Sequence, residues 1–300
     1  MPKTKHILNE FESTEKRVPM AWHERDDTCV EFRISTIEPA LTPERLAEIV
    51  GWQPSESIAP GDTVWQYRDP LPRQKPARRP ARFTDCTFSS HALIDSPDVT
   101  EHIKAILRFF ETRLSELRQI GGRRSCLESK IIIRHSGPAE TQLDLGLLTR
   151  LHSLGTTRGI NFTFELEDKH GRYGEKDEEK PEKDIFYFSY FLAWDRDNPC
   201  PFEDREYRFE YVGDKNIYGM DECSYCPEDD FRAALINTVH GQRGLITPLL
   251  ACGYRGTFRL AWDYGNDFRW DYLSRESLDI MSGVADRVVF AFVYSVLNND

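Results

Sequence analysis

Short segments in which apolar and polar residues alternate recur along this chain of 300 residues. The segment CVEFRIST (29–36) places Val30, Phe32 and Ile34 on one side, which is typical of a strand with one buried face. The same reasoning predicts strands in SKIIIRHSG (129–137), INFTFEL (160–166), IFYFSYFLAW (185–194), REYRFEYVG (205–213), GTFRLAWDYG (256–265) and RVVFAFVYSV (287–296). The aromatic segments 185–194 and 205–213 are expected to pair with each other.

Helices are predicted between these strands. The segment 96–122 has apolar residues at three- and four-residue steps, which favours one long amphipathic helix. Shorter helices are expected in 142–155 and from 229 to Cys252, the latter interrupted near Gly241 and Gly244.

Two of the shortest predicted helices have marked ends. In LTPERLAEIVGWQP (41–54), Thr42 is placed to cap the helix, Pro43 suits its first position and Gly51 its left-handed end. Ser274 repeats the capping role in LSRESL. A helix of about two turns is marginal by itself, so such signals indicate short helices held at a defined place against a sheet.

The later elements of the two halves match one another. HIKAIL (102–107) aligns with DFRAAL (230–235), and the spacing stays near 127–128 residues through the strand and helix segments that follow. Gly137 and Gly155 align with Gly265 and Gly283. This conserved spacing predicts an internal duplication.

The predicted fold is therefore α+β, with two related modules that each have a mixed or antiparallel sheet and helices packed on one face. We expect a polar N-terminal extension (1–27), a first module (28–166), a charged linker (167–184) and a second, diverged module (185–300). The linker carries almost only polar and charged residues and has no hydrophobic period.

Composition narrows the range of partners. Fifty acidic residues against 39 lysines and arginines give a net charge of −11, which disfavours nucleic acid and suits a basic protein partner. No apolar run approaches the roughly 18 residues of a membrane helix, so no membrane association is expected. Seven dispersed cysteines and the absence of a signal-peptide pattern favour the cytoplasm.

The first half also carries a family resemblance. The strand residues Phe32 and Ile34, the capped helix 41–49, Gly51, Pro54 and the Gly61–Asp62 turn resemble the start of the bacterial domain of unknown function 4279. The resemblance covers about residues 29–166. The family usually has a tryptophan on the strand before its long helix, whereas this chain has Phe83, Cys86 and Phe88 there. It implies a small bacterial interaction module of the kind found near toxin and immunity genes, with no functional residues to transfer.

Motifs for chemistry are sparse. The sequence has no G-x-S-x-G, phosphate-binding, dinucleotide-binding or H-E-x-x-H pattern, so we predict no catalytic residue and no cofactor. Cys223 and Cys226 have the spacing of half a zinc site. Without a second tight pair of ligands, no metal site is assigned, and unpaired loop thiols remain the alternative.

Two charged segments are candidate interaction surfaces. The segment RDPLPRQKPARRPAR (68–82) holds six basic residues and four prolines, and is expected to be an extended, exposed loop. Within it, Arg73, Arg78 and Arg79 are candidates for contacting an acidic surface.

The second surface mixes acidic and aromatic residues. Its candidate partner-binding residues are Trp194, Asp195, Asp197, Phe202, Glu203, Asp204 and Tyr207. Aromatic anchors ringed by charge are typical of tight protein interfaces. The alternative is an acidic edge strand protected against aggregation.

The sequence thus favours a non-catalytic protein-binding function. The family resemblance implies a bacterial immunity protein that neutralises a cognate toxin, with a basic toxin domain as the expected partner. Two alternatives stay open. One is an enzyme that acts on a nucleotide or another small anionic substrate between the two modules, and the other is a regulatory adaptor.

Overall fold

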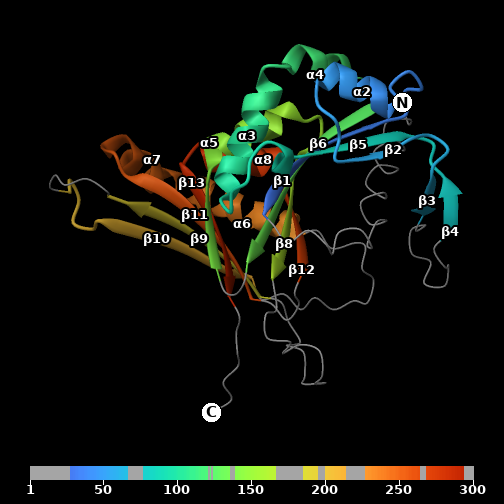
Figure 1. The fold of residues 1–300 in the computed structure, drawn as a ribbon. Coiled ribbons are helices and arrows are strands. Elements are labelled where there is room, and N and C mark those ends of the chain that lie inside the picture. The colour runs from blue at the N-terminus through green and yellow to red at the C-terminus, as the bar shows by residue number, and fades with distance from the viewer. Residues whose placement is uncertain are drawn as a thin grey trace, which may run out of the picture. The chain divides into compact units, whose positions relative to one another are not determined.

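The structure is a computed structural model that describes residues 28–66, 77–120, 122, 124–135, 139–166, 185–194, 200–213, 227–263 and 268–293. Helices are interspersed with the strands of mixed sheets along these residues (Figure 1), so the predicted α+β class is confirmed. The expected N-terminal extension (1–27) and the expected charged linker (167–184) lie outside the described residues.

The helices are α2 (Pro43–Val50), α3 (Val99–Glu111), α4 (Leu114–Ile120), α5 (Leu145–Leu154), α6 (Pro227–Gly241), α7 (Arg243–Cys252) and α8 (Arg275–Ser282), with a short 3-10 helix η2 (Ser90–Ala92). The strands are β1 (Cys29–Thr36), β2 (Glu56–Ile58), β3 (Thr63–Gln66), β4 (Ala77–Pro80), β5 (Thr84–Ser89), β6 (Ser125–His135), β7 (Ala139–Asp144), β8 (Gly159–Leu166), β9 (Ile185–Ala193), β10 (Glu206–Gly213), β11 (Arg255–Asp263), β12 (Phe268–Ser274) and β13 (Arg287–Val293).

The fold separates into two compact units. The first contains the described residues up to Ile133 together with Arg150–Phe162. The second contains Arg134–Thr149 and the described parts of Thr163–Met220 and Cys226–Asp300. Each unit is described by itself.

The sheet of the first unit contains the strands in the order β8-β6-β1-β5-β2, and β1 is antiparallel to both β5 and β6. The alternation in β1 has the predicted effect: Val30, Phe32 and Ile34 are fully buried. Phe32 packs on Phe110 of α3, with ring centroids 4.3 Å apart. The apolar face of this sheet is therefore the one that α3 covers.

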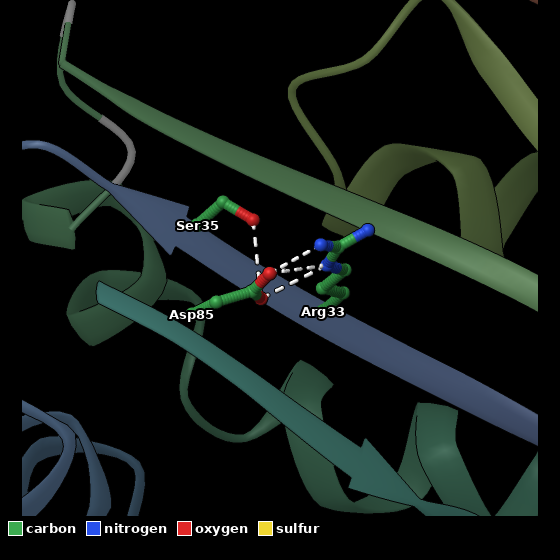
Figure 2. A network of polar contacts seen from close by, with 3 residues as sticks. All are labelled: Arg33, Ser35 and Asp85. Carbon is green, nitrogen blue, oxygen red and sulfur yellow. Dashed lines mark hydrogen bonds and ion pairs between the residues drawn. The ribbon is translucent and has the colours of Figure 1, made fainter. Parts of the chain in front are cut away.

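The other face of β1 carries an ion pair that sequence analysis did not single out. Figure 2 shows Asp85 of β5 between Arg33 and Ser35 of β1. Arg33 Nε donates to Asp85 Oδ1 at 2.9 Å, Arg33 Nη2 donates to Oδ2, and Ser35 Oγ donates to Oδ1 at 3.2 Å. Asp85 is buried, so this carboxylate depends on those donors. The contacts tie β1 to β5 in a single register.

The sheet of the second unit has the order β10-β9-β11-β13-β7 and is mixed: β11 is parallel to β13 and the other pairs are antiparallel. Both α6 and α7 contact β9. The predicted pairing of 185–194 with 205–213 is confirmed, with Glu206 opposite Ala193 and Phe209 opposite Tyr190.

The strand β7 departs from the expected modules. Residues 139–144 were expected to belong to the first module (28–166), yet they form β7, which pairs with β13 in the second unit. The backbone N–H of Leu145 donates to the carbonyl of Asp286 at 2.9 Å and extends that ladder. The contiguous boundaries expected at 166 and 185 therefore differ from the observed units, because a strand joins the sheet that satisfies its backbone groups.

The two sheets share one topology. Along the chain, β1, β5, β6 and β8 occur in the same order as β9, β10, β11 and β13, and each set lies in the same order across its sheet. In both sets the first strand is antiparallel to its two neighbours. The aligned segments HIKAIL and DFRAAL lie in α3 and α6, at equivalent places in this order.

The predicted helix signals are confirmed at both short helices. The Thr42 side chain accepts the N–H of Arg45 at 3.3 Å, and Gly51 has a φ of 73°. Ser274 Oγ accepts the N–H of Ser277 at 3.1 Å. Capping of this kind satisfies N–H groups that have no partner inside the helix.

The single long helix expected over 96–122 is wrong, because α3 ends at Glu111 and α4 begins at Leu114. At the break, Thr112 Oγ1 and Arg113 Nη1 donate to the carbonyl of Phe109 at 2.8 and 3.0 Å. These side chains take up a carbonyl near the end of α3. The apolar stripe continues across the break, because Phe110 and Leu117 are both buried.

The close approach at Gly256 yields a stability prediction. A Cβ at this position would lie directly against the Val284 carbonyl oxygen and 2.8 Å from the Tyr190 hydroxyl, which donates to the same carbonyl. We expect Gly256→Ala to lower the free energy of unfolding by about 1–3 kcal/mol through overpacking, measured by urea denaturation. Gly244→Ala is the matched control: a Cβ at Gly244 meets no atom within 4 Å, so it should be neutral or stabilising. Equal losses in both variants would contradict this account.

The Arg33–Asp85 pair yields a second prediction. Asp85→Ala should lower the free energy of unfolding by about 3–5 kcal/mol, because it leaves the Arg33 charge without its carboxylate. The double variant Arg33→Met/Asp85→Leu should lose less than Asp85→Ala alone. Urea denaturation of both variants measures the difference. If the double variant loses as much as Asp85→Ala, the loss in Asp85→Ala does not come from the Arg33 charge that it leaves behind.

Candidate functional site: an aromatic patch beside the outer strand of the second sheet

Three separate segments of the second unit meet at the end of β9. Trp194 directly follows β9, Phe202 lies in the loop before β10, and Tyr207 is the second residue of β10. Tyr254 directly precedes β11. Because β9 pairs with both β10 and β11, Ala193 stands opposite Glu206 on one side and Arg255 on the other. This pairing brings segments about 50 residues apart to the same end of the sheet.

The aromatic residues of these segments surround Tyr254. The ring of Tyr254 lies 5.4 Å from Trp194, 6.0 Å from Phe202 and 5.8 Å from Tyr207, measured between centroids. These distances are typical of favourable aromatic pairs. Tyr254 is only 3% exposed, whereas Phe202 is 40% exposed. We call these four residues the Tyr254 patch. Its base, Tyr254, is buried, Trp194 and Tyr207 are half-buried, and Phe202 is exposed.

Hydrogen bonds hold the loop that carries Phe202. The Tyr254 hydroxyl donates to the Asp204 carbonyl at 2.5 Å and lies 2.7 Å from Cys200 Sγ. The Cys200 thiol also donates to the Asp204 carbonyl, at 3.6 Å, so this carbonyl holds both side chains. The backbone N–H of Trp194 also donates to the Arg205 carbonyl at 2.8 Å. The described part of the loop, residues 200–205, is therefore attached both to Tyr254 and to the end of β9.

Burial raises the pKa of Tyr254, and its hydrogen bond with Cys200 and the nearby Cys200, Tyr207 and Asp204 act in the same direction. The phenol consequently stays protonated at neutral pH and remains a donor. Desolvation also raises the pKa of Tyr207, helped by the charges of Asp204, Cys200 and Glu203. Both rings are thus neutral, which suits contact with an apolar group.

The charges around the patch are mixed. Glu203, Asp204 and Glu206 are exposed, but so are Arg205 and Arg208, which leaves a net charge of −1 over residues 200–208. The guanidinium of Arg208 lies 4.8 Å from the ring centroid of Phe191. The described residues around the patch are therefore less acidic than their three carboxylates alone would make them, because two arginines lie among them. Asp195 and Asp197 lie outside the described residues.

The structure thus gathers Trp194, Phe202 and Tyr207 of the predicted surface into one patch and places Glu203 and Asp204 beside them. Sequence analysis missed Tyr254, which lies outside the acidic–aromatic segment, and Cys200, which is neither acidic nor aromatic. No local signal marks Tyr254 as the base, because its role depends on the pairing of β11 with β9.

The basic segment differs from the expected extended loop. Its last part forms β4, which pairs with β3 and places Arg78 opposite Trp65 and Arg79 opposite Val64. Arg79 is exposed, and Arg73 lies outside the described residues. The prolines did not prevent a strand because Pro80 stands at its end, where proline is tolerated. This hairpin belongs to the first unit, whereas the Tyr254 patch belongs to the second.

A serine–histidine pair in the first unit has a structural explanation. Ser90 Oγ lies 2.7 Å from His102 Nδ1, and His102 Nε2 lies 2.6 Å from the Ser96 carbonyl. Nε2 must therefore be the donor, and Nδ1 accepts the Ser90 proton, while Ser90 Oγ accepts the N–H of Val30 at 2.9 Å. Both side chains are fully buried, so the pair links β1, η2 and α3 and does not face a substrate.

Other reactive groups are placed in the same way. Burial raises the pKa of the Cys86 thiol to about 12, with the charges of Asp85 and Glu44 adding to the effect, so it is not a thiolate nucleophile at neutral pH. Within the described residues, no group of three or more His, Cys, Asp or Glu side chains could hold a metal ion. Cys223 and Cys226 lie outside those residues.

Comparison with known proteins adds no family to this picture. No protein-family model matches the chain, and no curated protein and no solved structure matches it. No helix among the described residues is long and apolar enough to cross a membrane. The function must therefore be argued from the site itself.

Proposed function

We propose that this protein is a non-catalytic protein-binding module that captures a protein partner through the Tyr254 patch. The resemblance of residues 29–166 to a family found near toxin and immunity genes extends the proposal to a bacterial immunity protein that neutralises a cognate toxin. The proposed setting is the cytoplasm, in keeping with the dispersed cysteines.

One observation carries the proposal: Phe202 is 40% exposed, while its ring makes an edge-on contact with Tyr254, which is buried and hydrogen-bonded. An exposed aromatic ring on a fixed support offers apolar area with little ordering cost on binding. Interfaces draw most of their affinity from a few such anchors surrounded by polar residues. The mixed rim of Glu203, Asp204 and Arg205 supplies that surrounding, where charge tunes specificity more than affinity.

The charge of the whole chain supports a basic partner. A net charge of −11 attracts a cationic protein over distances of about the Debye length and raises its association rate. The patch itself carries little net charge. We therefore propose that the charge of the whole chain steers the partner at long range and that the aromatic rings bind it at short range.

We also propose that the two sheets arose by duplication. The conserved spacing of 127–128 residues and the shared strand order support this origin. The Tyr254 patch uses the outer strand of the second sheet, at the place where the first sheet has β5, with α2 packed against it and β2 paired to it. Among the described strands, β5 is thus paired on both sides, whereas β10 is paired with β9 alone.

The test is affinity capture with tagged full-length protein from cells of the source organism, followed by mass spectrometry of the bound proteins. We expect a stoichiometric partner, toxic when expressed alone. Phe202→Ala should weaken its binding about tenfold or more, as loss of an interface anchor does, measured by calorimetry with the purified partner.

Leu245→Ala is the matched control, because Leu245 is also 40% exposed in the second unit but lies on α7 and is not one of the four residues of the patch. It should leave the affinity unchanged, and neither variant should alter the melting temperature by more than a few degrees. A partner that binds wild type and Phe202→Ala equally would exclude the patch as the binding surface.

A further inference from the structure

The loop of the Tyr254 patch carries two carboxylates that have no counter-charge. Glu203 and Asp204 directly follow the exposed ring of the patch and are themselves exposed. Within the part of the chain that the structure describes, neither takes part in an ion pair, although Arg205 comes next in the sequence. The exposed carboxylate of Glu140, by contrast, lies 2.8 Å from the guanidinium of Arg259. The negative charge of the loop is therefore not neutralised by these residues.

Both carboxylates act on the rings of the patch. Desolvation raises the pKa of Tyr207, and the charges of Asp204 and Glu203 add to the effect. The charge of Asp204 also adds to the raised pKa of Tyr254, which burial dominates. Because the interaction between charges weakens with distance, the two carboxylates lie close to these rings. The patch thus combines aromatic faces with negative charge.

The arginines of the same segment do not occupy the rings. The guanidinium of Arg208 lies 4.8 Å from the ring centroid of Phe191. Successive side chains of a strand point to opposite faces, so Arg208 lies on the face of β10 opposite Tyr207. No arginine or lysine among the described residues lies over the ring of Phe202 or Tyr207. These two rings therefore have no cation from the described part of the chain.

We infer that the Tyr254 patch binds a cationic side chain of the partner, an arginine or a lysine. Its charged group lies over the exposed ring of Phe202, beside the carboxylates of Glu203 and Asp204. The negative face of an aromatic ring attracts a cation, and the planar guanidinium of arginine also stacks on such rings. Since the proposed function places the partner on this patch, the inference rests on it and names the chemical group that is bound.

The chemistry of the loop favours a cation over an apolar group. An apolar side chain placed on Phe202 would remove water from the neighbouring carboxylates and supply no counter-charge, which is costly. A lysine or arginine supplies the charge, and its aliphatic stem still provides apolar contact with the rings. The occupant is therefore a side chain that is apolar along its length and cationic at its end.

N-acetyl-arginine amide and its uncharged analogue N-acetyl-citrulline amide are the probes, because they have nearly the same shape and differ in charge. Their binding to the isotope-labelled full chain is measured by NMR titration up to about 50 mM. The arginine probe should bind about fivefold more tightly than the citrulline probe, as a cation–π contact at an exposed site provides. Equal binding of the two probes, or no binding of the arginine probe, would overturn the inference.

Phe202→Leu separates the aromatic face from the apolar area. Leucine keeps a large apolar side chain but has no π system, so this variant should bind the arginine probe about fivefold more weakly than the wild type does. Its affinity for the citrulline probe should change little. Unchanged binding of the arginine probe to this variant would contradict a cation over the ring.

Two further variants test the carboxylates. Glu203→Gln should weaken the arginine probe about twofold, the scale of an exposed ion pair. Glu206→Gln is the matched control, because it removes an equal charge from the same exposed segment, on the face of β10 opposite Tyr207. It should leave the affinity nearly unchanged. Equal losses in both variants would show that only net charge acts, and would exclude a site beside Glu203.

The purified partner distinguishes failure here from failure of the proposed function. A partner that Phe202→Ala loses, but that Phe202→Leu binds as tightly as the wild type does, is held through an apolar group. The proposed function then stands and the cationic side chain is excluded. A partner that binds wild type, Phe202→Ala and Phe202→Leu equally does not use the patch, and both proposals fail together.

Discussion

Each sheet depends on a central strand that must hydrogen-bond on both sides. β1 lies between β5 and β6, and β9 lies between β10 and β11, in both cases antiparallel to its two neighbours. An unpaired backbone group in the interior costs free energy comparable to a lost hydrogen bond. The chain therefore brings segments tens of residues apart to the same strand. The ion pair on β1 and the aromatic patch beside β9 both follow from this requirement.

The two units share one topology but hold the equivalent strands β5 and β10 by different interactions. In the first, β5 is held by the Arg33–Asp85 ion pair on one side and by β2 on the other, with α2 against it. In the second, β10 is held by β9 and by the hydrogen bonds around Tyr254. A buried ion pair contributes little net stability but penalises other registers. The aromatic rings around Tyr254 lie beside β10, and the ring of Phe202 is exposed.

Local physics explains which parts of the fold were predictable. Alternation along 29–36 indicated a strand because successive side chains point to opposite faces. Thr42, Gly51 and Ser274 marked helix ends because capping uses only nearby residues. The pairing of 185–194 with 205–213 was also predicted, since both segments are aromatic and close in sequence. Trp194, Phe202 and Tyr207 of the patch were identified on the same local grounds.

The sequence by itself determined the α+β class, most strands, the short capped helices and three aromatic residues of the patch, because these depend on neighbours a few residues away. Only the tertiary structure decided that β7 pairs with β13, that Tyr254 is the base of the patch, and that Asp85 meets Arg33. These outcomes depend on hydrogen-bond partners supplied by distant segments, and no local pattern records which distant segment supplies them.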